Sequence, residues 1–450
     1  MTGTNTKNAI ILLLGISLLL FNTKELKSQN DAKKIKYRRS SLHTILVESE
    51  EFPRKETVIK AYNNAPFPDK YNNHSLEARS FNPKDFVITE EDRKAFGKNR
   101  RKAGGFLKDA ANLAQGKKAD EEGRDMPITI TKYIRESKLA NKLVAKWFDR
   151  QPDGSFDMNL IGERGSYNAS EMEANIAKGS ARGLSSLADA GEELIHNTFV
   201  VFSRLTFVSN EIAAAAARDV AKNLAKSYIS DTSTLRKTMQ MADETYERAK
   251  EGYSVWTYSY LYQLKWNDSI AAVFYNDLWI DKSKPDSLKK AAFDKSNIFE
   301  LEYIGDERAA SLVTFSAKET RTEDQLVEIA TVRNLDNVLY RLQKKFEVFK
   351  TKVPLYTGNP ITAKIGMKEG LEGGERFEVL EQTLDPKTGL TTYKQKGKIT
   401  VDKHLLWDNR FVAGETVKTD SSATVKPVID RTTFSGGSDY YPGMLIRQLH

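Results

Sequence analysis

The stretch NTFVVFSRLTF, Asn197 to Phe207, decides the fold of this chain. It is rich in β-branched and aromatic residues and contains no glycine or proline, which is typical of a strand. The segment that follows, Ser209 to Tyr228, carries Ile212, Ala216, Val220 and Leu224 at steps of four, and this spacing predicts a helix with one apolar stripe. A strand that leads directly into such a helix indicates a domain that mixes the two element types.

A second strand is predicted further along, at Tyr253 to Trp266 (YSVWTYSYLYQLKW). Because side chains alternate along a strand, one face receives the aromatic residues Trp256, Tyr258, Tyr260 and Tyr262. Two interpretations are open. The face is a buried one, covered by helices such as Thr322 to Lys350, or its rings form a platform that stacks on sugars or grips a peptide. We take these four residues as a candidate interaction surface.

Other elements of the central region follow from periodicity and capping. The segment TEDQ, Thr322 to Gln325, is a capping box that starts the clearest helix of the chain, with Leu335, Val338 and Leu342 on its apolar side. A second capping box is predicted at Ser170 to Glu173. We further expect strands at Ile128–Thr131, Ser155–Ile161, Phe299–Ile304 and Ala309–Phe315, and helices at Ile134–Phe148 and Leu184–Ile195.

The last hundred residues predict a separate β-domain. Pro354 and Pro360 interrupt the helical pattern. Short strands then follow at close spacing, as in a compact barrel, at Ile361–Ile365, Arg376–Glu381, Thr391–Lys396, Ile399–Val401 and Met444–Ile446. Asp385 to Gly389 (DPKTG) has the composition of a hairpin turn.

The amino terminus has the layout of a secretory signal peptide. Lys7 precedes an apolar run from Ala9 to Phe21, and a polar stretch ends at the cleavage site Ser28-Gln29. The alternative is an uncleaved anchor, but the run is shorter than the roughly 20 residues that cross a bilayer. We therefore expect an exported protein, periplasmic or associated with the outer membrane, with no integral membrane span after cleavage.

The expected architecture is α+β or α/β, a mixed sheet with flanking helices followed by a small SH3-like β-barrel. We expect four regions, namely a signal peptide (1–28), an irregular amino-terminal region (29–125), an α/β domain (126–352) and the SH3-like β-domain (353–450).

Composition excludes several kinds of chemistry. The chain has no cysteine, which rules out disulfides, thiolate metal sites, a cysteine nucleophile and a lipid-anchored lipoprotein, and favours a bacterial envelope over a eukaryotic secretory route. The formal net charge is +8, but the charges are interspersed, so we expect no nucleic-acid partner. The basic stretch from Lys94 to Lys118 indicates a solvated helix face or a mobile arm, or alternatively a patch that touches lipid headgroups, acidic polysaccharide or a partner.

No motif declares a catalytic or cofactor site. The sequence lacks Gly-x-Ser-x-Gly, a phosphate-binding Gly-x-x-x-x-Gly-Lys-Ser/Thr loop and Gly-x-Gly-x-x-Gly. Glu193 and His196 have helical Glu-x-x-His spacing, but a di-iron site needs a second copy, which is missing. We therefore expect no catalytic residues, no cofactor and no metal.

Two serines are candidates for modification. Asp268-Ser269-Ile270 and Asp286-Ser287-Leu288 match the Asp-Ser/Thr-aliphatic pattern that Bacteroidetes O-glycosylate on exported proteins, so Ser269 and Ser287 are candidate acceptors. The Ser28-Gln29 junction is also a common cleavage style in that group.

Two segments resemble bacterial envelope-assembly proteins. The carboxy-terminal stretch, with Leu371, Gly374, Phe377, Gly389, Pro442 and Gly443, resembles the SH3-like module of flagellar assembly protein T. The segment LADAGEELIHNTFVVFSRLTFV, Leu187 to Val208, resembles the helix-then-strand part of the fold shared by curli-secretion component G and the amino-terminal domain of TolB. The chain departs from curli-secretion component G because it lacks a lipidation cysteine, so pore formation is not implied.

These observations lead to two functional hypotheses. The first is an exported, non-enzymatic envelope protein that mediates protein–protein interaction, in assembly or support of an outer-membrane or surface structure, with other envelope proteins as partners. The alternative is a periplasmic or secreted glycan-binding protein or hydrolase that uses the aromatic strand face, with a glycan as ligand.

Overall fold

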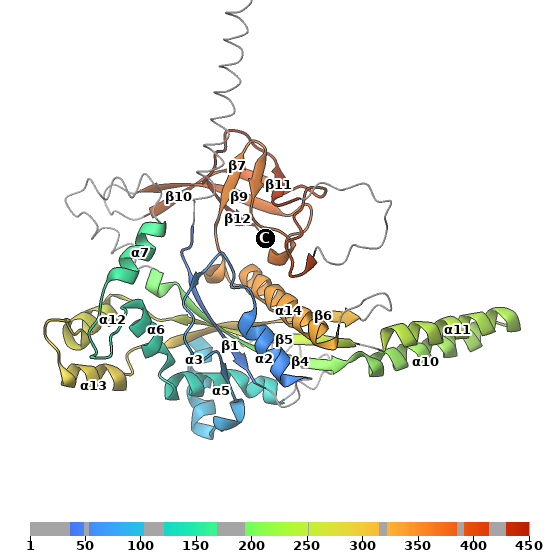
Figure 1. The fold of residues 1–450 in the computed structure, drawn as a ribbon, viewed down its shortest axis with the longest axis horizontal. Coiled ribbons are helices and arrows are strands. Elements are labelled where there is room, and N and C mark those ends of the chain that lie inside the picture. Colours follow the sequence, from blue (N-terminus) through green and yellow to red (C-terminus); the bar gives the residue numbers. More distant parts are fainter. Residues whose placement is uncertain are drawn as a thin grey trace, which may run out of the picture. The chain divides into compact units, whose positions relative to one another are not determined.

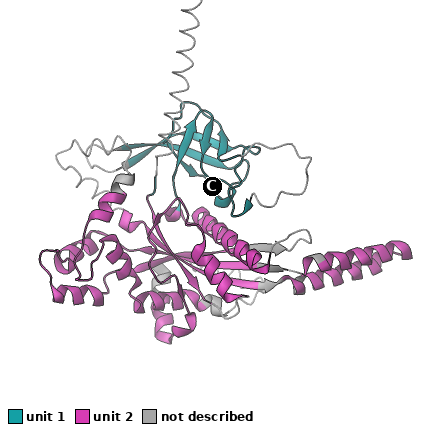
Figure 2. Ribbon diagram, viewed as in Figure 1, with its two compact units in different colours: residues 1–38, 166–186, 350–450 teal, residues 39–165, 187–349 magenta. Residues whose placement is uncertain are grey.

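The computed structural model describes residues 37–48, 54–102, 121–168, 194–250, 252–314, 322–384, 391–413 and 429–449. The chain divides into two compact units (Figure 2). The larger combines Arg39–Gly165 with Leu187–Phe349, and the smaller combines Lys350–His450 with Met1–Arg38 and Ser166–Ser186.

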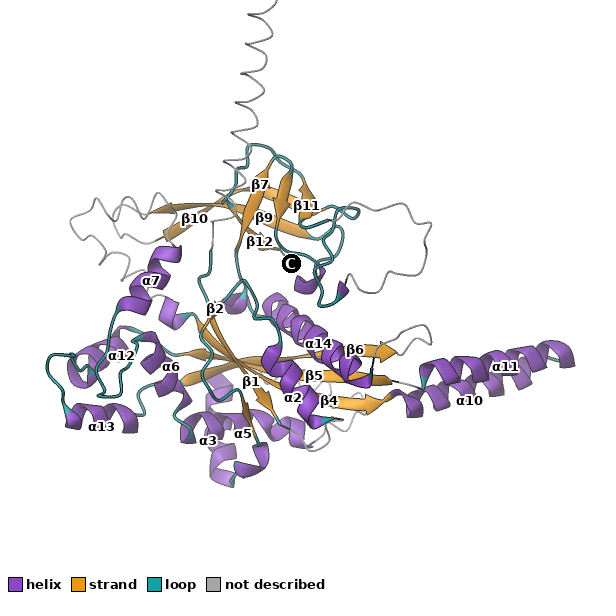
Figure 3. Ribbon diagram, in the orientation of Figure 1, coloured by secondary structure: helices purple, strands orange, loops and turns teal. Residues whose placement is uncertain are grey.

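The larger unit is a mixed sheet with helices on both faces (Figures 1 and 3). Its strands are β1 (Ser41–Val47), β2 (Asn72–Asn73), β3 (Ser80–Phe81), β4 (Thr198–Ser209), β5 (Gly252–Leu264) and β6 (Leu301–Thr314). Its helices are α2 (Lys55–Asn64), α3 (Glu90–Lys102), α5 (Glu121–Glu136), α6 (Leu139–Trp147), α7 (Asn159–Asn168), α10 (Asn210–Tyr228), α11 (Thr232–Ala249), α12 (Asp268–Val273), α13 (Ser287–Lys295) and α14 (Glu323–Lys345).

The strand order is β2-β1-β4-β5-β6, with β3 also paired to β1. β1 runs parallel to β2, β3 and β4, whereas β4, β5 and β6 are antiparallel neighbours. The β4–β5 register runs from Phe199 opposite Gln263 to Ser209 opposite Tyr253. The predicted strand at Asn197–Phe207 and the predicted helix after it are thus confirmed.

One face of the sheet carries the largest core of the unit. Phe202 from β4 and Tyr262 from β5 are fully buried there against α5 and α6, together with Trp147 and Phe148. Aromatic rings dominate this core, and Phe148, Phe156, Phe274 and Phe293 form a connected cluster beneath α12 and α13. Rings of this kind bury large apolar areas and pack edge to face, which stabilises the sheet from this side.

The opposite face is covered by α2 and α14. Leu261 of β5 packs with Leu339 and Leu342 of α14, and Val255 of β5 packs with Val327 and Ala330. The capping box predicted at Thr322 is present, because its side chain accepts from the Gln325 backbone N–H and the Gln325 side chain accepts from the Thr322 N–H. The expectation that α14 covers the aromatic side of β5 is wrong, because this helix contacts the aliphatic residues of the other side.

The predicted strand Ile128–Thr131 lies inside helix α5. Met126, Ile130 and Ile134 are buried at steps of four, the spacing of one helix face, so tertiary packing overrides the β-branched composition. The predicted strand Ser155–Ile161 is likewise absent. The Asp157 carboxylate accepts from the Asn159 N–H at 2.5 Å, and α7 begins at Asn159.

The amino-terminal region also differs from expectation. Residues 29–125 were predicted to be irregular and separate from the sheet, but β1 lies within that range and pairs along its full length with β4. Its SLHTILV sequence is buried on both faces, as expected of a strand that is flanked by neighbours and covered by helices. The two strands predicted at Phe299–Ile304 and Ala309–Phe315 form one strand, β6.

The smaller unit contains a closed six-stranded antiparallel barrel. Its strands are β7 (Val353–Gly358), β8 (Ile361–Ala363), β9 (Arg376–Leu384), β10 (Thr391–Val401), β11 (Thr432–Ser435) and β12 (Leu445–Gln448), in the order β10-β11-β8-β7-β12-β9. Phe377, Val379, Ile399 and Ile446 fill its interior. Tyr37 packs on the outside with Leu380 and Leu445. The small carboxy-terminal barrel is confirmed, whereas the turn predicted at Asp385–Gly389 lies outside the described residues.

No helix among the described residues is both long enough and apolar enough to cross a bilayer.

We expect Gly305→Ala to destabilise the larger unit by about 1–3 kcal/mol. Gly305 occupies a bulge in β6, where the register against β5 shifts, and an added methyl carbon would lie 2.5 Å from the Phe346 ring. Urea unfolding checks this, with Gly97→Ala as the matched control, because nothing lies within 4 Å of the methyl group added there in helix α3. Equal midpoints for the two variants would contradict the account.

Candidate functional site

The four aromatic residues proposed as an interaction surface do not share one environment. Tyr260 and Tyr262 are buried in the core, and the Tyr262 hydroxyl donates to the Pro127 carbonyl at 3.0 Å. These two residues therefore cannot belong to an accessible platform. Trp256 and Tyr258 lie further along β5 and are half-buried.

Trp256 and Tyr258 are partly covered by an arginine of the neighbouring strand. Arg308 of β6 is paired with Tyr258 across the ladder, and its guanidinium lies 4.9 Å from the centroid of the Trp256 ring and 5.9 Å from that of Tyr258. The contact is a cation–π interaction, which occupies part of the ring face that a sugar would need. A glycan-binding role is thus limited to two rings and would have to displace Arg308.

A buried imidazole cluster lies on the same face of the sheet as α6. The rings of His74 and Trp147 are stacked at 5.0 Å, and the Arg164 guanidinium lies 4.4 Å from the centre of the Trp147 ring. One Arg164 nitrogen lies 2.9 Å from His74 Nδ1 and donates to Ser41 Oγ at 3.1 Å, and another donates to the Asn73 carbonyl at 3.0 Å. These contacts hold α7 against β1 and the segment after β2.

A second histidine of this cluster, His43 of β1, accepts from the Leu76 N–H at 3.4 Å, and His43 and His74 are both fully buried. Desolvation lowers the pKa of His43 to about 3, helped by the positive charges of Arg79 and Lys146. Desolvation, followed by the charge of Arg164, holds the pKa of His74 well below its usual value. Because neither imidazole ring reaches solvent, neither can act on a substrate. The role of the cluster is structural, since it connects α7 with β1 and the segment after β2.

The connection between β4 and β5 is a helical arm. Ser209 and Tyr253 pair at one end of the two strands, and between them the chain forms α10 and α11, joined at residues 229–231. The two helices lie side by side and extend away from the sheet (Figure 1). We call this helix pair the arm; it is an extension of what would otherwise be a simple β-hairpin.

The two helices of the arm meet through small and polar side chains. Ala214 and Ala225 of α10 are buried. Lys222 Nζ lies 2.5 Å from the Asp243 carboxylate of α11, and the Arg218 guanidinium lies 4.4 Å from the centre of the Tyr246 ring. Asp231 caps α11 by accepting from the Thr234 N–H at 2.7 Å.

Three larger apolar side chains of α10 face solvent instead. Val220, Leu224 and Tyr228 are 58%, 53% and 81% exposed, and Ala217 and Ala221 are also exposed. A helical period of 3.6 residues places these five residues on one side of α10, which we call the outer stripe. The apolar stripe predicted from Val220 and Leu224 is therefore present, and no other residue that the structure describes covers it at these two positions.

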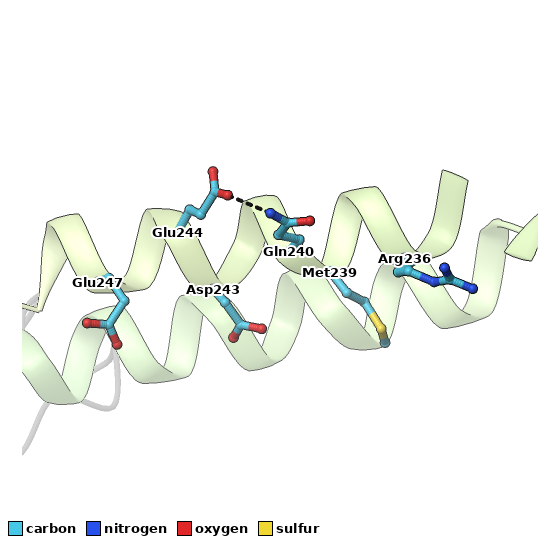
Figure 4. Close-up of a pocket in the computed structure, with 6 residues that line it drawn as sticks. All are labelled: Arg236, Met239, Gln240, Asp243, Glu244 and Glu247. Carbon is cyan, nitrogen blue, oxygen red and sulfur yellow. Dashed lines mark hydrogen bonds between the residues drawn. The ribbon is translucent and has the colours of Figure 1, made fainter. Parts of the chain in front are cut away.

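A shallow groove, open to solvent, runs along α11 (Figure 4). Its lining comes from one helix and is mainly charged, namely Arg236, Met239, Gln240, Asp243, Glu244 and Glu247. The Gln240 amide donates to the Glu244 carboxylate at 3.0 Å. Side chains from a single exposed helix do not enclose a substrate, so this groove has no catalytic arrangement.

The candidate acceptor serines are both exposed in the first turn of short helices. Ser269 follows the cap of α12, where Asn267 accepts from the Ile270 N–H at 3.0 Å. Ser287 follows Asp286, which caps α13 by accepting from two backbone N–H groups. Helix capping thus explains the local sequence around Ser287 without any modification, while both hydroxyls remain accessible.

The remaining predicted site residues lie outside the described residues or at the surface. Ser28, Gln29, Glu193 and the capping box at Ser170–Glu173 lie outside the described residues. His196 is exposed in the helical turn before β4. Among the residues that the structure describes, no group of three or more His, Asp or Glu side chains is placed to hold a metal ion.

No protein-family model matches this chain, and no curated protein matches it.

The imidazole cluster and helix α11 were missed from the sequence. The cluster combines residues from positions far apart in the chain. In the sequence its histidines are isolated, with no spacing that links them to one another. Helix α11 lacks a strong apolar stripe, although its Asp231 cap followed by a long run without glycine or proline could have indicated it.

We expect the larger unit to lose about 2 kcal/mol of stability between pH 7 and pH 5 through His43, and a further amount through His74. Both pKa values are depressed by folding, so both imidazoles favour the folded state above pH 6.5, and this contribution falls as the unfolded chain takes up protons. Hydrogen exchange of the β1 and β4 backbone amides at the two pH values measures this loss of stability locally.

In His43→Gln the pH-dependent loss of stability should be smaller by about 2 kcal/mol. His404→Gln, at an exposed position of the barrel unit, is the control and should leave the loss unchanged. The same pH dependence in His43→Gln as in the parent protein would show that the cluster does not behave as described.

Proposed function

We propose that this chain is an exported, non-enzymatic protein of a bacterial envelope that works through protein–protein contacts, in the assembly or support of an outer-membrane or surface structure. The observation that carries the proposal is the outer stripe of α10. Three large apolar side chains, each more than half exposed, follow one another on a helix that extends from the body of its unit.

An exposed, continuous apolar surface of this kind is unusual on a monomer and marks a contact site. Burial of Val220, Leu224 and Tyr228 against a partner would remove from water an apolar area that the described part of the chain leaves exposed. A helix that offers apolar residues at steps of four matches the helix-packing mode of recognition, in which those residues enter a groove between two facing helices.

The fold of the sheet does not require the arm. The β4–β5 register is complete up to Ser209 and Tyr253, so the sheet needs only a short turn at that point. The arm therefore adds surface beyond what the fold requires.

The export part of the proposal rests on the sequence. The basic start, the apolar run from Ala9 to Phe21 and the Ser28-Gln29 junction support it, and so does the absence of cysteine. The resemblances to flagellar assembly protein T, TolB and curli-secretion component G support an envelope role with other envelope proteins as partners.

Replacement of residues 210–252 by an Asn-Gly turn should leave the sheet folded and abolish capture of envelope partners. Circular dichroism checks the fold, and quantitative mass spectrometry of crosslinked envelope extract checks the capture. Val220→Asp should weaken capture in the same way, whereas Met241→Asp should not, because Met241 is an equally exposed apolar residue of α11 away from the outer stripe. Unchanged capture by the arm-deleted protein would refute the proposal.

The protein isolated from its natural source should begin at Gln29. Amino-terminal sequencing and intact mass measure this, and cell fractionation should recover the protein with the envelope. Hexose additions in the same mass spectrum would support modification of Ser269 or Ser287, and their absence would remove that hypothesis. A chain that starts at Met1 in the cytoplasmic fraction would contradict export.

A further inference from the structure

We propose that the outer stripe of α10 packs antiparallel against the outer stripe of a second copy of this chain, so that two arms form one four-helix contact. The inference rests on the proposed function, because it names the occupant of the same surface. The stripe is exposed, carries no charged residue and alternates small with large side chains.

The charges of α10 all lie away from the outer stripe. The helix has five charged residues, Glu211, Arg218, Asp219, Lys222 and Lys226. The helical period places each of them on the side of α11 or on the flank next to it, and Lys222 and Arg218 contact α11 directly. A second apolar surface can therefore approach the outer stripe without burying a charge, which would otherwise oppose association.

Side-chain size along the stripe fits an antiparallel partner. If two copies of α10 cross with their two-fold axis between residues 222 and 223, Ala217 lies opposite Tyr228 of the second copy and Ala221 lies opposite Leu224. Two-fold symmetry repeats both pairs. Large residues then face small ones at every level, which is the arrangement that lets two helices approach closely and interdigitate. A parallel pair would instead place Leu224 against Leu224 and alanine against alanine.

The contact should be weak. One helix face from each copy gives an interface at or below the lower limit of about 1,200 Å² for stable complexes. We therefore expect a dimer that dissociates in the micromolar range and that gains strength when copies are concentrated on a common structure.

Analytical ultracentrifugation of the intact protein over a concentration series tests the proposal. We expect a reversible monomer–dimer equilibrium that Leu224→Asp weakens at least ten-fold, with Met241→Asp as the matched control that leaves it unchanged. Both positions are exposed, so neither change should affect folding. Monomer at every concentration, or equal effects of the two variants, would overturn the inference.

The absence of native cysteine allows a second readout that does not depend on affinity. Proteins with Ala217→Cys and with Tyr228→Cys should form a disulfide-linked dimer when mixed under mild oxidation, and neither should do so alone. Each variant carries a single cysteine, so a disulfide within one chain cannot form. Efficient crosslinking of Ala217→Cys with itself would indicate a parallel pair and contradict the proposed register.

Two further outcomes separate this inference from its alternatives. Stripe-dependent co-sedimentation of monomeric protein with anionic phospholipid vesicles would show that a lipid surface, and not a second copy, covers the stripe. Loss of envelope partners in Val220→Asp while the parent protein stays monomeric would leave the proposed function standing and overturn the inference about self-association.

Discussion

The pairing of β4 with β5 is the constraint on which the larger unit depends. Both faces of β5 are covered, with Tyr260 and Tyr262 on one side and Val255 and Leu261 on the other. A slip of one residue would exchange the two sets and place tyrosines against α14. The register therefore determines which helices can pack on each face, and its last pair determines where the arm begins.

Much of the fold could be predicted because the signals are local. β4, β5, α10, the cap of α14 and a small carboxy-terminal barrel follow from alternation, helical spacing and capping within single segments. α5 was assigned as a strand because Ile128 to Thr131 is β-branched, and only packing against the sheet makes that segment helical. β1 was missed because its neighbour β4 is far along the chain, and a parallel pairing leaves no local turn signal.

The candidate site was predicted less well, and the reason is physical. A pattern shows which residues share a side of an element, but it does not show what covers that side. Trp256 and Tyr262 share one face of β5, yet one is half-buried and the other is sealed beneath α5. The opposite case is α10, where the stripe with Val220 and Leu224 was visible in the sequence but its exposure was not. The contact between α10 and α11 uses alanines and an ion pair, so the apolar side is left outward.

Because the arm is inserted between two paired strands, the fold of the sheet does not determine how long the arm is. Each residue added to α10 and to α11 would move the tip outward by about 1.5 Å, while the strand pair at the base keeps the same hydrogen bonds. Insertions or deletions of whole helical turns there would be tolerated by the body of the protein, and they would change the reach of the tip without changing the core. The arm can therefore act as a spacer whose span is free to vary between related proteins.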